Sequence, residues 1–164
     1  MNIKTADIGT VSHAKLRPQD LAEAFGNELE AQIMRQTRDG SNRVILDYCT
    51  ETLWDAREEF YNEAGEFVES EHTHEYIHSL IEALDVFAPA HCYFGAIEGD
   101  NSELSPSIFG YWPCWDSLDE LPKVGELPDG PIDDETECVQ VSDHGNATLY
   151  AWDGAKWTEV WGLV

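Results

Sequence analysis

The sequence predicts an α+β fold, in which about three N-terminal helices pack on a C-terminal antiparallel sheet of about five strands. Up to residue 88, apolar residues recur every three or four positions, which is the spacing of a helix with one buried face. From residue 90 onward, apolar and polar residues alternate, which is typical of half-buried strands. The length of 164 residues fits a single domain over residues 1–164, with a helical part at 18–88 and a β part at 91–164.

Three helices are expected after a polar, extended segment at residues 1–16. The first covers residues 18–36, because Pro18 suits the first helical position. The second covers residues 43–64, with Gly65 as its C-terminal stop, and the third covers 71–88 and ends before Pro89. The buried face of the second helix is expected to consist of Leu46, Cys49, Leu53, Ala56 and Phe60.

Five strands are expected in the β part, at residues 91–97, 108–112, 138–142, 148–152 and 157–164. The pair Asp153-Gly154 lies between the last two, and Asp-Gly between alternating segments is a strong hairpin signal. A helical turn is expected at residues 115–121. Residues 116–137, named here the acidic connector, are rich in Pro, Gly and acids from residue 123 onward and have no apolar periodicity there.

The net charge of −24 is unevenly distributed along the chain. Residues 58–164 contain 24 acidic residues against two lysines, whereas residues 1–57 contain nine acidic and seven basic residues. Such a charge destabilises a compact chain by self-repulsion. It also repels phosphates, which excludes nucleic acid as a direct ligand of most of the surface, and it excludes anionic membranes on the same ground. A strongly basic partner is therefore expected, and surfaces that bind DNA or RNA are the commonest of these.

One group of acids is expected to form a stripe along the second helix. Its members are Asp47, Glu51, Asp55, Glu59 and Glu63, and Glu66 follows them. Successive acids are four residues apart, so at ~1.5 Å per residue they step ~6 Å along the helix. Like charges at this spacing repel each other, and only Arg57 is near enough in sequence to relieve them. Because a curved row of negative charges resembles a DNA strand, we expect a partner-binding surface; a solvated helix face is the alternative.

A second group of candidate partner-binding acids lies in the acidic connector. It consists of Asp116, Asp119, Glu120, Asp133, Asp134 and Glu135. The connector holds nine acids in 22 residues against Lys123 alone. A flexible, self-repelling loop explains this composition as well as a binding patch does. The D-x-D-x-D-G spacing of a calcium loop does not occur.

Metal chemistry is weakly indicated by His72, His74 and His78. His74 and His78 are four residues apart, which can place two imidazoles on one metal, and residues 74–78 (HEYIH) have the H-E-x-x-H spacing. A solvated polar face is nevertheless favoured over a metal site. The four cysteines form no C-x-x-C pair and are expected to be buried thiols, with a four-cysteine zinc site as a minor alternative: Cys49, Cys92, Cys114 and Cys138.

The sequence contains no G-x-S-x-G, no P-loop and no G-x-G-x-x-G. The aromatic residues of the β part are expected to form core rather than a ligand groove. We therefore expect a protein that is not an enzyme and needs no cofactor. The first residues lack the apolar stretch of a signal peptide, and no run of 18 apolar residues occurs, so a cytoplasmic location is expected.

Two segments carry a resemblance to known sequences. Residues 93–100 read YFGAIEGD and residues 109–113 read FGYWP; residues 16–21 (LRPQDL) and 141–150 (VSDHGNATLY) accompany them. Together they resemble small acidic proteins of unknown function from bacteria, phages and plasmids. The loop between these two segments, which includes Glu98–Ser107, is longer here than is usual in such proteins, because Asn101–Ile108 lengthens it. The resemblance implies no catalytic residues, and the charge alone is similar to DNA mimics that block restriction or CRISPR complexes.

The leading functional hypothesis is therefore an acidic inhibitor that mimics nucleic acid and occupies the basic DNA- or RNA-binding surface of a host defence complex. An immunity protein or antitoxin that masks a basic toxin is the first alternative. A metal-dependent enzyme using His74 and His78 is an alternative of a different class. A salt-adapted solubility surface is disfavoured, because residues 1–57 are nearly balanced in charge.

Overall fold

The computed structural model describes residues 3–12, 17–36, 42–97, 108–133, 135–142 and 146–163. Over these residues the protein has mixed α and β structure, with four helices and two sheets of three and four strands. The expected single sheet of about five strands is therefore wrong. The chain divides into two compact units, Met1–Ala88 with Phe94–Trp112 (unit 1) and Pro89–Tyr93 with Pro113–Val164 (unit 2). Each unit is described by itself.

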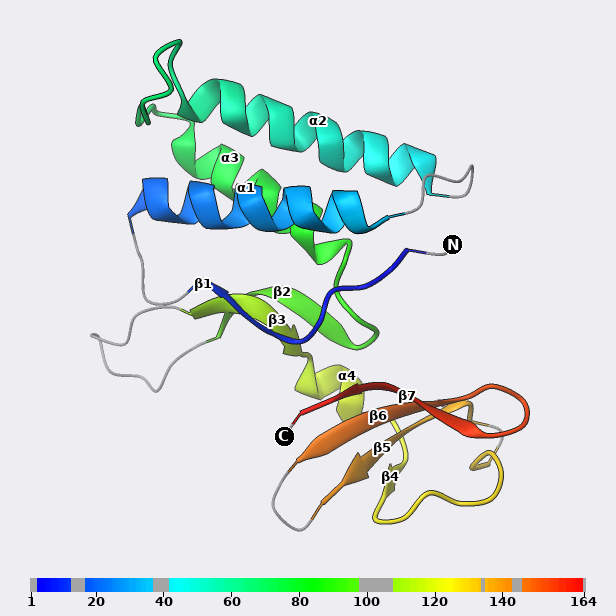
Figure 1. The fold of residues 1–164 in the computed structure, drawn as a ribbon. Coiled ribbons are helices and arrows are strands. Elements are labelled where there is room, and N and C mark those ends of the chain that lie inside the picture. Colours follow the sequence, from blue (N-terminus) through cyan, green and yellow to red (C-terminus); the bar gives the residue numbers. More distant parts are fainter. Residues whose placement is uncertain are drawn as a thin grey trace, which may run out of the picture. The chain divides into compact units, whose positions relative to one another are not determined.

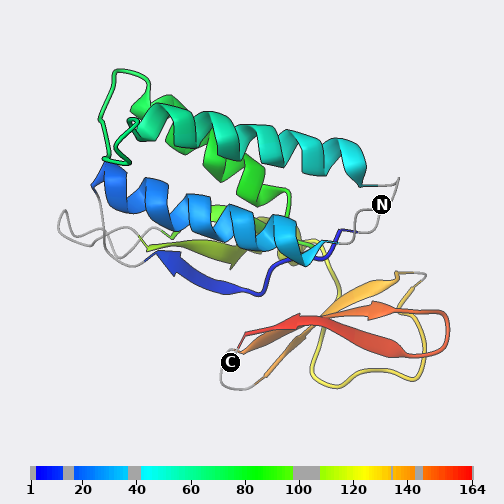
Figure 2. The same cartoon turned by 45° about the horizontal axis from the view of Figure 1, so that its top comes forward.

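Unit 1 contains the three long helices and the three-stranded sheet. Helices α1 (Pro18–Arg35), α2 (Arg43–Phe60) and α3 (Thr73–Asp85) pack against one another. The sheet has the order β1-β3-β2, with β1 at Gly9–Ser12, β2 at Cys92–Ile97 and β3 at Ile108–Pro113. Figures 1 and 2 both show α1 and α3 between the sheet and α2, so α2 is the outermost layer of unit 1.

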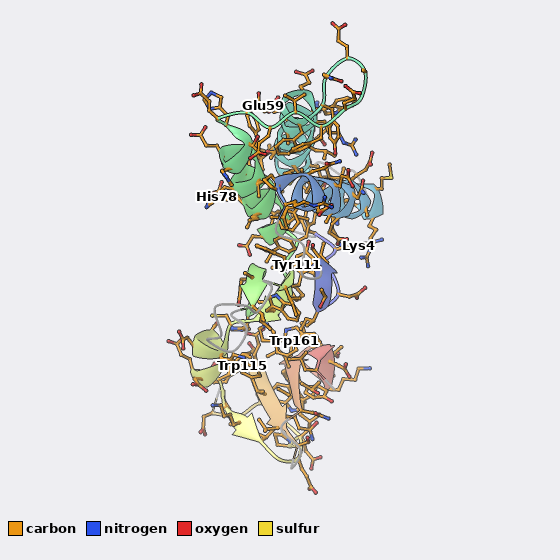
Figure 3. The ribbon with its side chains drawn as sticks, turned by 90° about the vertical axis from the view of Figure 1, so that its left-hand side faces the viewer. Lys4, Glu59, His78, Tyr111, Trp115 and Trp161 are labelled. Carbon is orange, nitrogen blue, oxygen red and sulfur yellow. The ribbon has the colours of Figure 1, made fainter. Side chains whose placement is uncertain are left out.

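The core of unit 1 joins the helices to the sheet through aromatic rings. Phe25 of α1 is fully buried and meets Phe94 of β2 and Phe109 of β3 edge-on, with ring centroids 5.4 Å and 5.1 Å apart. Tyr111 of β3 is only 1% exposed and packs against Phe94 at 4.9 Å. Figure 3 shows Tyr111 below the helices, at the level of this sheet. Burial raises the pKa of the Tyr111 hydroxyl, and nearby Glu28 and Asp85 raise it further.

The segment before α1 was expected to be extended, and part of it forms the edge strand β1. β1 pairs antiparallel with β3, with Thr10 opposite Gly110. The preceding residues are also fixed: the Lys4 N–H donates to Gln36 Oε1 at 2.9 Å, and the Gln36 amide donates to the Lys4 carbonyl at 2.8 Å. This reciprocal pair fastens the N-terminal segment to the end of α1.

The second helix ends four residues earlier than expected, at Phe60. A tight turn follows, in which Tyr61 pairs with Phe67 across an isolated bridge. The Asn62 side chain accepts hydrogen bonds from the N–H groups of Ala64 and Glu66, both at 2.9 Å. Gly65 has a φ of +75°, so it serves this turn rather than the end of the helix.

Unit 2 contains the four-stranded sheet and a short helix, α4 (Trp115–Asp119). The sheet order is β4-β5-β6-β7, with β4 at Lys123–Val124, β5 at Glu137–Val141, β6 at Ala147–Trp152 and β7 at Trp157–Gly162. β4 and β5 are parallel, which the sequence did not predict, and the other pairs are antiparallel. The buried apolar residues of unit 2 are Leu118, Cys138, Val139, Ala147, Leu149 and Trp161.

The Asp153-Gly154 hairpin is present as expected. Asp153 Oδ1 accepts from the N–H groups of Ala155 and Lys156, both at 2.9 Å, and Gly154 has a φ of +97°. The N–H groups of Lys156 and Ala155 lower the pKa of the Asp153 carboxyl. The contribution of this carboxylate to stability is therefore present above the ordinary pKa and is lost as the pH falls through the lowered value.

None of the helices in the described residues has both the length and the apolar character that crossing a membrane requires.

The close approach of β1 to β3 makes Gly110 hard to replace. A Cβ atom built on Gly110 would lie 2.1 Å from the Gly9 carbonyl oxygen and 2.9 Å from the Thr10 Cα. Both are backbone atoms, so the strands would have to separate. We expect Gly110→Ala to lower the free energy of unfolding by roughly 1–3 kcal/mol, the usual cost of overpacking. Thermal melting checks this, with Gly125→Ala as the control, since nothing lies within 4 Å of a Cβ at that position. Equal melting temperatures would contradict the close approach.

Candidate functional site

The candidate site in unit 1 is the outer face of α2. Five residues of this helix are buried, and they are the set that the spacing predicted: Leu46, Cys49, Leu53, Ala56 and Phe60. Their burial against α1 and α3 turns the opposite side of α2 to solvent. Asp47, Glu51 and Asp55 are exposed there, and Glu58 is exposed as well. We call these four acids the α2 acidic face.

The expected stripe of five helical acids is wrong at its C-terminal end. Glu63 and Glu66 are exposed but lie in the turn after α2. Glu59 is only partly exposed, because its carboxylate accepts a hydrogen bond from the Ser70 hydroxyl. Figure 3 shows Glu59 at the end of α2 that leads into this turn. The sequence did not reveal this, because nothing in the helical period shows where the helix stops.

Of the two arginines on α2, only one pairs with an acid of the same helix. Arg43 lies 3.5 Å from the Asp47 carboxylate, a pair that the sequence interpretation overlooked. Arg57 does not serve the α2 acids: its guanidinium binds Glu30 of α1 at 2.7 Å. Hydrogen bonding to Arg57 and its charge lower the pKa of Glu30. Among the described residues, Glu51, Asp55 and Glu58 have no ion-pair partner within 4.0 Å.

Large apolar residues share the outer surface of α2 with the acids. Val44 is 82% exposed, Trp54 is 60% exposed, and Tyr48 is also exposed. These residues were not among the expected surface features. Their positions do not match the spacing of the buried set, which would have been enough to place them outside the core.

Trp54 borders a shallow groove between α1 and α2, named here the α1–α2 groove. Its lining comprises Glu30, Ile33 and Met34 from α1 and Thr50, Leu53, Trp54 and Arg57 from α2. The Arg57–Glu30 pair spans the two helices within this lining. The groove measures about 200 Å³. A drug-sized ligand needs ~300–1,000 Å³, so the groove suits a single side chain better.

The acidic connector lies in unit 2, and its acids are spread over several elements. Asp116 and Asp119 belong to α4, Glu120 follows it, and all three are exposed. Asp119 forms an ion pair with Lys123. Asp133 and Glu135 are exposed, whereas Asp134 lies outside the described residues. Most of the connector is irregular, but it also contains α4 and β4.

The last acid of the connector, Glu137, begins β5 and has a structural partner. Its carboxylate lies 3.1 Å from His91 Nε2, and His91 Nδ1 lies 2.6 Å from the Ser117 hydroxyl. These contacts link β5, α4 and the start of β2 within unit 2.

Two of the histidines on and beside α3 lie next to acidic residues. His72 lies 3.3 Å from Glu75, and His78 lies 3.4 Å from Glu82. His74 and His78 are exposed, and Figure 3 shows His78 on the outer side of α3. In the part of the chain that the structure describes, no three His, Cys, Asp or Glu residues are placed to hold a metal ion.

The four cysteines are free thiols. Cys49 and Cys138 are buried as expected, whereas Cys92 and Cys114 are partly exposed. Burial raises the pKa of Cys49 to about 11. Burial, with a smaller effect from Cys114, raises the pKa of Cys92 to about 12. Both groups are therefore protonated near neutral pH, which makes them poor nucleophiles.

Comparisons with known proteins gave no relative. No protein-family model matches the chain, and no match was found among curated proteins or solved structures.

The unpaired acids of the α2 acidic face predict that stability depends on salt. Raising the ionic strength to 0.15 M shortens the Debye length to ~8 Å and screens repulsion between exposed acids. We expect the melting temperature to rise between low and moderate salt. Glu51→Gln should raise it slightly at low salt, since like charges four apart cost a few tenths of a kcal/mol. A melting temperature that is flat or falls with salt would show that the repulsion is negligible.

Proposed function

We propose that this protein is an acidic inhibitor that mimics nucleic acid and occupies the basic DNA- or RNA-binding surface of a host defence complex, such as a restriction enzyme or a CRISPR effector. The observation that carries the proposal is the α2 acidic face. It consists of carboxylates on a rigid, outermost helix, and three of them have no cation of their own chain within 4.0 Å among the described residues.

The spacing of these acids can be compared with the spacing of phosphates along a DNA strand. Glu51 and Asp55 are four residues apart, or ~6 Å along the helix axis. One DNA strand presents a charge every ~3.4 Å of its axis. The α2 row is therefore about half as dense as one strand, so it would replace alternate phosphates. Long-range attraction would come from the net charge of −24.

The acidic connector is the second candidate surface within the same function. Its exposed acids Asp116, Glu120 and Glu135 lie in unit 2 and would meet basic residues of the partner by the same attraction. An immunity protein that masks a basic toxin is the alternative, because it needs the same charge but no resemblance to DNA.

Competition with DNA separates mimicry from the alternative. Purified restriction enzymes and CRISPR effector complexes would be assayed for DNA binding with and without this protein. We expect inhibition that excess duplex DNA relieves, and a loss of affinity of roughly tenfold or more between 50 and 200 mM salt. A complex that survives saturating DNA would contradict mimicry and favour an immunity-type contact.

Two charge-matched variants test which acidic surface binds. The first carries Glu51→Gln, Asp55→Asn and Glu58→Gln on α2, and the second carries Asp116→Asn, Glu120→Gln and Glu135→Gln in unit 2. Each removes three negative charges, so a general effect of net charge is equal in both. We expect the α2 variant to lose at least tenfold in affinity, mainly through slower association. The unit 2 variant should lose much less. The reverse order would move the binding surface to the connector.

A further inference from the structure

Pure charge mimicry leaves the apolar part of the α2 surface unexplained. Trp54 is 60% exposed and Met34, across the α1–α2 groove, is 75% exposed. Both lie on well-formed helices rather than at chain ends. Tryptophan is enriched among residues that dominate binding energy at protein interfaces. The surface therefore combines an aromatic residue with an apolar groove and an acidic rim.

The acids are placed around the Trp54 ring in a specific way. Glu51 precedes Trp54 by three residues and Glu58 follows it by four, and side chains at these offsets are neighbours on a helix surface, with Cβ atoms ~5–6 Å apart. Trp54 thus lies between two exposed carboxylates. A cation over the indole ring would meet the ring face and both carboxylates together.

We propose that the α1–α2 groove is an arginine-binding site for a basic partner protein. The aliphatic stem of the arginine lies along Ile33, Met34 and Leu53, and its guanidinium stacks on Trp54 between Glu51 and Glu58. This inference rests on the proposed function, from which it takes the basic character of the partner. It adds that the partner inserts an arginine side chain.

Arginine fits this site better than lysine for two reasons. Its planar guanidinium stacks on aromatic rings and is more weakly hydrated than an ammonium group, so it loses less on leaving water. Its fork of donors can also bind a carboxylate with two hydrogen bonds at once, which an ammonium group does not match. The chain's own Arg57 does not compete, because its guanidinium is held by both carboxylate oxygens of Glu30 at 2.7 and 3.4 Å.

A second copy of this chain is a poor occupant of the groove. Each copy has a net charge of −24, and exposed acids flank Trp54 at the edge of the groove, so two such faces repel each other. A small neutral ligand would fill the groove but leave the acidic rim unused. Charge complementarity therefore selects a cationic side chain from a basic protein.

The test uses the full-length protein with hexaarginine and hexalysine as probes of equal charge. Binding is measured at low salt by the shifts of the indole Nε1–H signals in NMR spectra, and the Trp54 signal is assigned by its loss in Trp54→Leu. We expect hexaarginine to bind at least fivefold more tightly than hexalysine and to shift the Trp54 signal most. Trp54→Leu should remove this preference while binding of hexalysine changes less than twofold.

Matched variants complete the test. Trp115→Leu removes a tryptophan that is 56% exposed in unit 2 and should leave the preference intact. Glu51→Gln with Glu58→Gln should weaken hexaarginine binding at least fivefold, and circular dichroism melting verifies that each variant is folded. Equal affinities for the two peptides, or an unchanged preference in Trp54→Leu, would overturn the arginine site. Failure of DNA competition would refute mimicry alone and leave this result standing.

Discussion

The burial of the inner face of α2 is the constraint on which the rest of unit 1 depends. A chain with a net charge of −24 gains nothing electrostatically by folding, so apolar burial must outweigh the repulsion. Leu46, Cys49 and Phe60 are each at most 1% exposed, and they hold α2 against α1 and α3. Because this face is fixed, the opposite face is fixed too, and the acids and Trp54 are held in solvent on a rigid helix.

The charged residues on and near α2 fall into two groups, those that bind other parts of the fold and those that have no such partner among the described residues. Arg57 and Glu30 bridge α2 and α1, and the Ser70 hydroxyl holds Glu59, so these groups serve the fold. Glu51, Asp55 and Glu58 have no such role among the described contacts. Selection for stability alone does not favour three neighbouring like charges at helical spacing, since each pair is destabilising. The proposed role in recognition would supply such a reason.

The helices were predictable because one side of each is buried and the helical period records which side. That is why the five buried residues of α2 followed from the sequence alone. The strand β1 was missed because a four-residue edge strand of Gly, Thr, Val and Ser carries too little alternation. The parallel pairing of β4 was missed because two residues define it. The division into two sheets depends on which strands meet, and local patterns do not encode such long-range pairing.

The candidate site was predictable in part, for a similar reason. Periodicity placed Asp47, Glu51 and Asp55 on the outer face of α2, but it could not show that the helix ends before Glu63. It also could not show that Arg57 is committed to a neighbouring helix, because that contact joins residues 27 positions apart. The groove beside Trp54 is lined by residues of both α1 and α2, so the sequence pattern of either helix alone could not reveal it.

The turn after α2 has a thermodynamic consequence for recognition. Its two ends are joined by the bond from the Val68 N–H to the Phe60 carbonyl, and the bond between Ser70 and Glu59 lies just outside it. Inside it, Asn62 fixes the backbone, and Phe67 stacks near Phe60 and Tyr61. The backbone that carries Glu63 and Glu66 is therefore already ordered in the free protein. A partner that engages these acids would not have to order a loop, so the conformational entropy lost in this turn on association is confined to side-chain rotamers.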